Sequence, residues 1–230
     1  KIIKPKKNLN IAENFFHMCF GKVPQKEIVK AFDVSLILYA EHSFNVSTFT
    51  ARTITSSLSD IHGAITGAIA SLKGPLHGGA NEEVMHMMNK IKRPENALRW
   101  INEALDNKEV VMGFGHRVYK SGDSRVPTMR KYFAKVAKLK KDKKFERIYD
   151  IVEKVMIDRK NIHPNVDYPT GPTYHLMGFD TDFFTPIFVI SRITGWSAHI
   201  MEQHAANKLI RPLASYKGNR HRKVVQLNQR

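Results

Sequence analysis

Residues Met112–Arg125 read MGFGHRVYKSGDSR, and this stretch combines a flexible backbone with proton-exchanging and anion-binding side chains. Gly113 and Gly115 allow a sharp turn and a close approach of the backbone to a ligand. His116 can exchange a proton near neutral pH, and Arg125 can bind a carboxylate or phosphate through two parallel hydrogen bonds. The spacing alone fits a ligand-binding turn and a purely structural glycine turn equally well.

The charge of the chain indicates an anionic partner. With 37 Lys and Arg against 21 Asp and Glu, the 230 residues carry a net charge of +16. A basic helical nucleic-acid-binding protein would place aromatic residues between its basic ones. The run KVAKLKKDKK at 135–144 has only Val, Ala and Leu between its charges. We therefore expect a small, multiply charged ligand and no nucleic acid.

Neither membrane insertion nor disulfide bonding is indicated. The longest apolar runs, such as Phe183–Ile193, are too short to span a bilayer, and the basic N-terminus lacks the apolar core of a secretory signal. Cys19 is the single cysteine, which excludes an internal disulfide and favours a reducing compartment. We expect a cytoplasmic protein with no membrane partner.

Apolar residues recur at helical spacing along most of the chain and predict a mostly α fold. The pattern from Phe49 to Leu72 predicts a helix that is broken near Asp60–Gly63. Val110–Met112 is the one plausible strand before the glycine turn, with Arg117–Tyr119 as a possible antiparallel partner. Pro212 is expected to close the last helix. Further helices are predicted over Pro127–Leu139 and Lys144–Asp158.

Three of the eleven histidines lie in turn-rich places. His42 follows an apolar helix, His77 precedes a glycine pair at a helix start, and His116 follows Gly-Phe-Gly. A neutral histidine at a helix N-terminus can donate a hydrogen bond to a developing oxyanion. Asp167, in the turn-rich loop 161–171, fits either a carboxylate base or a turn-forming residue.

The sequence does not predict a metal site. It has no HExxH motif and no cysteine cluster, and no two of these loop histidines are one helical turn apart. No Gly-x-Ser-x-Gly or comparable nucleophile setting is present either.

Taken together, the motifs resemble the citrate synthase family, over nearly the whole chain from about Asn8 to Tyr216. The motifs stand in the family's order, which makes the series highly specific: AEHSFNVST at 40–48, KGPLHGGANEEV at 73–84, GFGHRVYKSGDSR at 113–125, PNVDYPTG at 164–171, FVISRITGWSAHIMEQ at 188–203 and IRP at 210–212.

The resemblance implies catalytic roles for three residues. Asp167 matches the aspartate that removes a proton from the α-carbon of an acyl-CoA. His77 matches the histidine that stabilises the resulting enol or enolate, and His116 matches the one that polarises the oxaloacetate carbonyl. The resemblance also implies ligands for the oxaloacetate carboxylates, at His42, Arg125 and Arg192.

The resemblance further implies the partners and the domain organisation. Arg211 matches an arginine that reaches the neighbouring subunit's site, so we expect a homodimer. Val110, Val111, Met112, Gly113, Phe114 and Gly115 fall where the family contacts CoA, and Lys120 stands where many relatives place an arginine near the CoA phosphates. We expect a two-domain helical fold, with residues 1–76 in part of a large domain, 77–172 in a small closing domain and 173–230 in the large domain and a C-terminal arm.

The expected activity is condensation of acetyl-CoA with oxaloacetate to give citrate and CoA, with no permanently bound cofactor and no metal. Condensation of propionyl-CoA to 2-methylcitrate is the alternative, which the motifs do not separate from the first. Relatives usually carry a helical region before the position at which this chain starts, so the sequence resembles a C-terminal portion. A catalytically incomplete fragment is therefore the third possibility.

Overall fold

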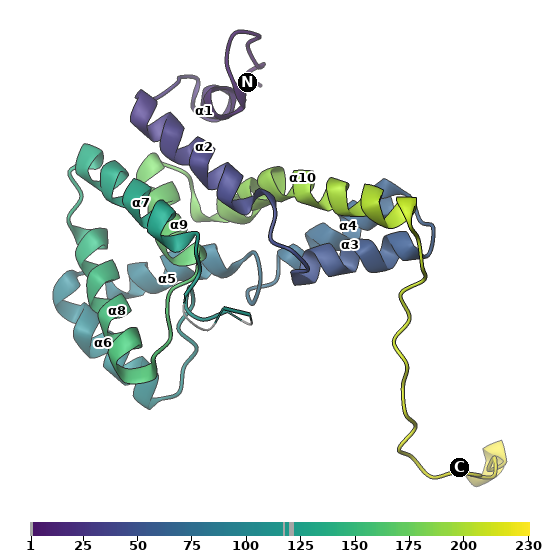
Figure 1. The fold of residues 1–230 in the computed structure, drawn as a ribbon. Helices are drawn as coiled ribbons and strands as arrows, with labels where there is room; N and C mark the ends of the chain where they lie inside the picture. The colour runs from purple at the N-terminus through teal and green to yellow at the C-terminus, as the bar shows by residue number, and fades with distance from the viewer. Residues whose placement is uncertain (1, 117, 120–121) are drawn as a thin grey trace.

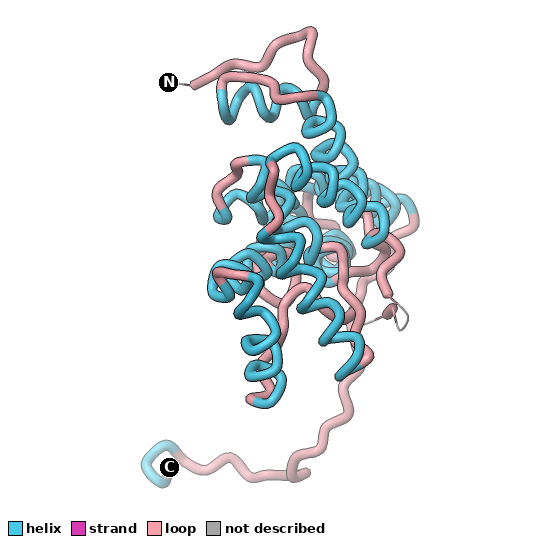
Figure 2. Tube along the Cα trace, turned by 90° about the vertical axis from the view of Figure 1, so that its left-hand side faces the viewer, coloured by secondary structure: helices cyan, strands magenta, loops and turns pink. Residues whose placement is uncertain are grey.

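The computed structural model describes residues 2–116, 118–119 and 122–230, and within these ranges the chain is almost entirely helical (Figures 1 and 2). This confirms the mostly α prediction. The helices are α1 (Ile11–Phe20), α2 (Lys26–Ala40), α3 (Val46–Ser56), α4 (Ile61–Leu72), α5 (Ala80–Ile91), α6 (Pro94–Asp106), α7 (Val126–Lys140), α8 (Lys144–Lys160), α9 (Asp167–Met177) and α10 (Phe184–Ala205), with two short 3-10 helices at Thr181–Phe183 and Leu227–Gln229.

Local sequence signals explain several helix boundaries. The Asn10 side chain caps α1 in a reciprocal arrangement with Glu13, and Asn45 caps α3. The predicted break near Asp60 is confirmed, because the Asp60 carboxylate accepts a hydrogen bond from the Gly63 N–H and starts α4. The predicted end of the last helix at Pro212 is wrong, since α10 already ends at Ala205.

The strand predicted at Val110–Met112 is also wrong. The structure has neither this strand nor a pairing with residues 118 and 119, and Arg117 lies outside the described residues. An isolated antiparallel bridge joins Phe114 to Pro164 instead. The glycine turn therefore pairs with the segment before α9, and not with its own continuation.

The helices form two parts that meet at α2 and α10 (Figure 1). Helices α5 to α9 pack together on one side, and α3 and α4 form a hairpin that lies along the C-terminal half of α10. Each part has its own buried apolar cluster, one built around Phe32, Met88 and Tyr149, the other around Tyr39, Ala68 and Trp196. In the part of the chain that the structure describes, no helix is long and apolar enough to cross a membrane.

The crossing of α2 and α10 depends on Gly195. A Cβ atom added at this position would overlap the Ala40 carbonyl oxygen, which belongs to the rigid end of α2. The missing side chain therefore lets the two helices approach closely, and this approach brings residues of α10 next to the turn that follows α2.

We expect Gly195→Ala to lower the free energy of unfolding by about 1–3 kcal/mol, because the added methyl must push backbone apart. Urea denaturation followed by circular dichroism measures this. Gly63→Ala is the matched control: its Cβ would meet only the side chains of Ser59 and Asp60. An unfolding midpoint for Gly195→Ala equal to that of the control would contradict the packing argument.

Candidate functional site

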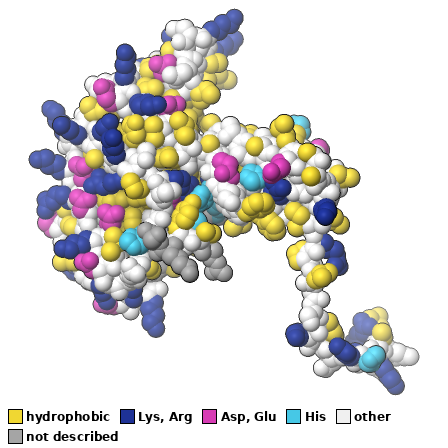
Figure 3. All heavy atoms as spheres, viewed as in Figure 1, with side chains coloured by type: hydrophobic (Ala, Val, Ile, Leu, Met, Phe, Trp, Pro, Cys, Tyr) yellow, Lys and Arg dark blue, Asp and Glu magenta, His cyan; other side chains and the backbone are white. Residues whose placement is uncertain are grey.

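A cleft of about 450 Å³ lies where the two parts of the fold meet. Figure 3 shows histidine side chains on the surface where these two parts meet. The cleft is lined by the turn after α2, the turn before α5, the start of α9 and the middle of α10. All six of the residues predicted to act in catalysis or to bind the oxaloacetate carboxylates from within the same chain line it together: His42, His77, His116, Arg125, Asp167 and Arg192.

Asp167 is the first residue of α9, so the expectation that it lies in an irregular loop is wrong. Its backbone N–H donates to the side chain of Asn165 at 3.1 Å, and its carboxylate accepts a hydrogen bond from the Tyr39 hydroxyl at 2.5 Å. Burial raises the pKa of Asp167 to about 6, while the Tyr39 hydrogen bond and Arg125 act in the opposite direction. The carboxylate is therefore ionised at neutral pH and is more basic than an exposed one.

His77 lies in the turn before α5, where Ser47 fixes its orientation. The backbone N–H of Ser47 donates to His77 Nε2 at 3.3 Å, and the Ser47 hydroxyl lies 2.8 Å from the same nitrogen. Since a backbone N–H can only donate, Nε2 acts as an acceptor and the neutral ring carries its hydrogen on Nδ1. Burial and Arg192 lower the pKa of His77 to about 4. His77 is thus a neutral hydrogen-bond donor at physiological pH.

His116 and His42 form a hydrogen-bonded pair with defined tautomers. The backbone N–H groups of Val118 and Tyr119 donate to His116 Nδ1 at 3.1 and 3.2 Å, so the His116 hydrogen lies on Nε2. This nitrogen lies 3.0 Å from Nε2 of His42. Burial lowers the pKa of both rings, with that of His42 at about 4. His116 therefore presents an N–H group that an incoming carbonyl can take over from His42.

The turn that carries His42 is anchored from two other helices. Glu41 accepts a hydrogen bond from His199 Nε2 of α10 at 3.0 Å. Arg52 of α3 approaches His199 Nδ1 at 3.0 Å. Since arginine can only donate, His199 must carry its hydrogen on Nε2, directed at Glu41. These contacts fix the backbone on which His42 stands.

Arg125 is paired with an acid inside the cleft wall. Its Nε lies 3.0 Å from Asp123 Oδ1 and a terminal nitrogen 2.7 Å from Oδ2, which is the two-pronged geometry of a strong ion pair. Asp123 also accepts a hydrogen bond from the Val166 N–H at 3.1 Å. The pair therefore joins the start of α7 to the start of α9.

Arg192 is a buried cation with an unused donor. Its Nε donates to the Tyr39 carbonyl at 2.5 Å, and its guanidinium lies over the Phe188 ring at 4.8 Å. Among the residues that the structure describes, its Nη1 has no hydrogen-bond partner although it is buried. Burial and the positive charge of Arg125 lower the pKa of Arg192 to about 10, so it stays protonated at neutral pH. A buried, unsatisfied cationic donor is the feature expected of an anion site.

The predicted CoA segment is only partly at this cleft. Of residues 110–115, only Gly115 lines it, while Val110 is exposed and Val111 is buried in the core. Gly113 and Gly115 both have positive φ angles, +83° and +79°, which the turn requires. Asn165 donates to the Gly115 carbonyl at 3.1 Å and so ties this turn to α9.

One other predicted residue that the structure describes is not brought to the cleft. Arg211 is exposed in the segment that follows α10, and it does not line the cleft. Lys120 lies outside the described residues.

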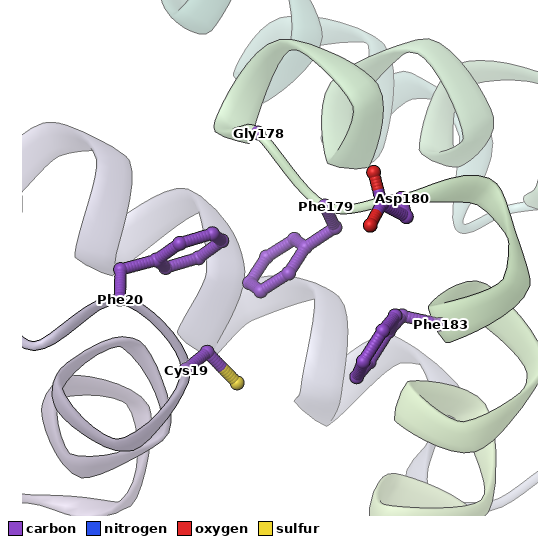
Figure 4. Close-up of a pocket in the computed structure, with 6 residues that line it drawn as sticks. All are labelled: Cys19, Phe20, Gly178, Phe179, Asp180 and Phe183. Carbon is purple, nitrogen blue, oxygen red and sulfur yellow. The ribbon is translucent and has the colours of Figure 1, made fainter. Parts of the chain in front are cut away.

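A smaller hollow of about 170 Å³ lies between α1 and the turn before α10, away from this cleft (Figure 4). It is lined by Cys19, Phe20, Gly178, Phe179, Asp180 and Phe183. Burial raises the pKa of the Cys19 thiol, which is the opposite of what an activated nucleophile needs. Within the described ranges, no three His, Cys, Asp or Glu side chains converge as metal ligands.

Comparisons with known proteins show the family of this chain. Residues 1–213 match the citrate synthase C-terminal domain. The chain belongs to the citrate synthase family. It is 56% identical to 2-methylcitrate synthase 2 of Corynebacterium glutamicum over 100% of this chain and 61% of the relative. It is 55% identical to the citrate synthase of Mycolicibacterium smegmatis, over 97% of this chain and 60% of the relative.

Solved structures of the family have the same fold. Citrate synthase from Thermotoga maritima matches with a TM-score of 0.91 and 36% identity, covering 100% of this chain and 63% of that one. The Thermoplasma acidophilum citrate synthase, solved in a ternary complex with carboxymethyl coenzyme A and oxaloacetate, also has a TM-score of 0.91, with 38% identity over 98% of this chain and 61% of that one. The chain thus spans about three fifths of the length of these citrate synthase relatives.

Four residues that contribute to the site were not singled out from the sequence. Tyr39 fits the apolar stripe of a helix, and Ser47 lies in a motif without any chemical signal of its own. Asn165 lies in a turn-like motif beside Asp167. Of the four, only Asp123 has a sequence signal: an acid two residues before Arg125 could have indicated an ion pair with that arginine.

We expect Asp123→Asn to lower the free energy of unfolding at pH 7 by about 3–5 kcal/mol, because it leaves the Arg125 charge without its buried partner. Arg125 and two backbone N–H groups hold the pKa of Asp123 below its usual value. This stabilisation is therefore fully present above about pH 4 and is lost as the pH falls through the lowered pKa.

Denaturant unfolding of both proteins at pH 7 and at about pH 3.5 measures the difference. The control is Asp33→Asn, which breaks an exposed pair with Lys30 and is expected to change the free energy of unfolding far less, because solvent screens exposed charges. An Asp123→Asn effect no larger than that of this control would show that the pair does not hold α7 to α9.

Proposed function

We propose that this chain catalyses, or forms the catalytic part of an enzyme that catalyses, condensation of an acyl-CoA with oxaloacetate. The observation that supports this most is the convergence of a basic carboxylate, Asp167, and a neutral donor, His77, in one cleft with buried arginines. The Thermoplasma acidophilum citrate synthase in complex with carboxymethyl coenzyme A and oxaloacetate agrees with this substrate pair.

The first step is removal of a proton from the α-carbon of the thioester by Asp167. A carbon acid next to a thioester is weak, so the developing enolate oxygen needs a preorganised donor. His77 supplies it through Nδ1–H, since its Nε2 is held by Ser47. Its low pKa keeps this donor neutral, and Asp167 is ionised at pH 7 because its own pKa is about 6.

The second substrate is held by the cationic side of the cleft. Arg192 offers its unsatisfied Nη1 to one carboxylate, and Arg125 and His42 complete the carboxylate site. The oxaloacetate ketone accepts the hydrogen bond that His116 Nε2 makes with His42 in the structure. This bond polarises the carbonyl towards attack.

Carbon–carbon bond formation joins the enolate carbon to this ketone carbon, and the His116 Nε2–H hydrogen bond stabilises the new alkoxide. The proton that Asp167 removed from the α-carbon ends on this alkoxide oxygen, which returns Asp167 to its ionised form. Water then cleaves the thioester of the citryl-CoA product to give citrate and free CoA. Acetyl-CoA is the first candidate substrate. Propionyl-CoA is the second, because relatives at 56% and 52% identity are 2-methylcitrate synthases.

Several further assignments belong to this proposal. Residues 110–115 and Lys120 contact CoA, no metal takes part, and residues 77–172 close as a small domain over the large one to exclude water. The compartment is the cytoplasm, in keeping with a single free cysteine. The competing proposal is a chain that folds and performs no chemistry.

We also propose a homodimer in which Arg211 enters the partner's site. The helical hairpin α3–α4 exposes large apolar side chains at Phe49, Leu58, Ile61 and Ile69. Exposed apolar surface of this kind favours association. Arg211 itself is exposed and free to reach outward from the segment after α10.

We expect Asp167→Asn to lower kcat by about 10²- to 10⁴-fold with little change in folding, as for loss of a general base. CoA thiol release from acetyl-CoA and from propionyl-CoA in the presence of oxaloacetate measures this. Because the ionised form is the base, kcat/KM in the unmodified chain should fall as the pH drops through about 6. A folded chain that releases no thiol with either acyl-CoA would favour the non-catalytic alternative.

We expect Arg211→Ala to raise the oxaloacetate KM by about tenfold or more, through loss of a charge-assisted hydrogen bond. Co-expressing it with Asp167→Asn tests the partner exchange. In a mixed dimer, the subunit with an intact Asp167 receives Arg211 from the other, so one of its two sites is complete. With random pairing about half of the dimers are mixed, so about a quarter of all sites are complete. No recovery of low-KM activity in the mixture, or a monomer by analytical ultracentrifugation, would refute the assignment.

A further inference from the structure

Tyr39 donates a hydrogen bond from its hydroxyl to Asp167, the proposed base. It lies near the end of α2 and is fully buried, and its hydroxyl lies 2.5 Å from Oδ1 of Asp167 at the start of α9. Among the residues that the structure describes, Oδ2 of Asp167 has no hydrogen-bond partner. The two oxygens of the carboxylate are therefore not equivalent.

Both ends of Tyr39 are fixed. Its ring packs against Phe188 of α10 with centroids 4.0 Å apart, and its carbonyl accepts a hydrogen bond from Arg192 Nε at 2.5 Å. The phenol therefore has little freedom to swing away from Asp167. A contact held from three helices gives a defined direction to the carboxylate plane.

Tyr39 is also a permanent donor. Burial and the nearby Asp167 carboxylate raise the pKa of Tyr39 well above its usual value, so the hydroxyl keeps its proton throughout the working pH range. A donor that bonds the charged form of an acid stabilises that form. Removing the Tyr39 hydroxyl would let burial raise the pKa of Asp167 further, so the carboxylic acid would keep its proton to a higher pH.

We propose that Tyr39 is a positioning residue for Asp167, whose hydroxyl occupies Oδ1 and leaves Oδ2 as the oxygen that takes the substrate proton. This rests on the proposed function, in which Asp167 is the base. The other charged groups that act on this carboxylate are Arg125 and Arg192, which favour its ionised form, and Asp123, which opposes it. The three cleft histidines are neutral, so Tyr39 is the neutral donor that can be removed without changing the charge of the site.

The test is Tyr39→Phe, which keeps the ring against Phe188 and removes only the hydroxyl. We expect the acidic limb of the kcat/KM profile to move to higher pH by about one unit, since a hydrogen bond to a charged group is worth about that much. On the plateau, kcat should fall by about tenfold because the carboxylate is less well oriented. Thiol release with acyl-CoA and oxaloacetate gives both values.

A second readout does not need turnover. The pKa of Asp167 is measured from the ¹³C chemical shift of its carboxyl group during a pH titration, with Asp167→Asn used to assign the signal. We expect this pKa to rise in Tyr39→Phe by the same amount as the acidic limb. If the unmodified chain has no activity, the proposed function fails, while the titration still decides whether Tyr39 stabilises the ionised carboxylate.

Tyr174→Phe is the matched control. Tyr174 is equally buried, and its hydroxyl lies 2.9 Å from the Ser35 hydroxyl, not at the Asp167 carboxylate. We expect Tyr174→Phe to lower the melting temperature about as much as Tyr39→Phe does and to leave the pKa of Asp167 unchanged. Equal shifts in the two variants, or no shift in Tyr39→Phe, would overturn the inference.

Should Tyr39→Phe fail to fold, 3-fluorotyrosine at position 39 keeps the ring and the hydroxyl and makes the phenol a stronger donor. The pKa of Asp167 should then fall, and the acidic limb should move to lower pH. An unchanged or raised pKa in this variant would equally overturn the inference.

Discussion

The ionised carboxylate of Asp167 is the group on which the proposed site depends. Burial alone opposes its charge, because a carboxylate loses favourable hydration when it leaves water. Tyr39 and the neighbouring arginines offset that penalty, and the resulting pKa of about 6 leaves a carboxylate that is both ionised and basic at pH 7. A more exposed acid would be a weaker base, and a more deeply buried one without these partners would stay protonated. The surroundings of Asp167 in the cleft lie between these two cases.

Burial and the same buried cations determine the state of the histidines. Burial and the arginines lower the pKa of His42 and His77 to about 4, so neither ring carries a charge at neutral pH. Backbone N–H groups then decide which ring nitrogen holds the hydrogen, at His77 through Ser47 and at His116 through residues 118 and 119. Donors that are neutral and already oriented are suited to stabilising a developing oxyanion, since they need no reorganisation when the charge appears.

The sequence predicted much of this arrangement, and the failures have physical causes. Ordered motifs predicted six catalytic and oxaloacetate-binding residues that the fold brings to one cleft, although they lie on five separate segments. Helical periodicity predicted most helices, including the break at Asp60. Proline and glycine after Asp167 suggested a loop, yet proline is tolerated in the first turn of a helix, where its missing N–H is not needed. The role of Tyr39 was not predicted, because an aromatic residue in the apolar stripe of a helix indicates only a core position. Its further role depends on the tertiary contact with Asp167.

Packing and chemistry meet at the crossing of α2 and α10. Gly195 lets α10 lie against the Ala40 carbonyl, and one turn earlier Arg192 reaches the Tyr39 carbonyl. Ala40, which contacts Gly195 of α10, thus follows directly on Tyr39, whose hydroxyl bonds Asp167. Arg192 belongs both to the helix contact and to the site, because it bonds the Tyr39 carbonyl and lines the cleft. Because a wider crossing would separate Arg192 from Tyr39, the helix spacing and the acidity of Asp167 are linked through the same few atoms. Close backbone contact at a glycine is therefore as much a requirement of the proposed chemistry as it is of the fold.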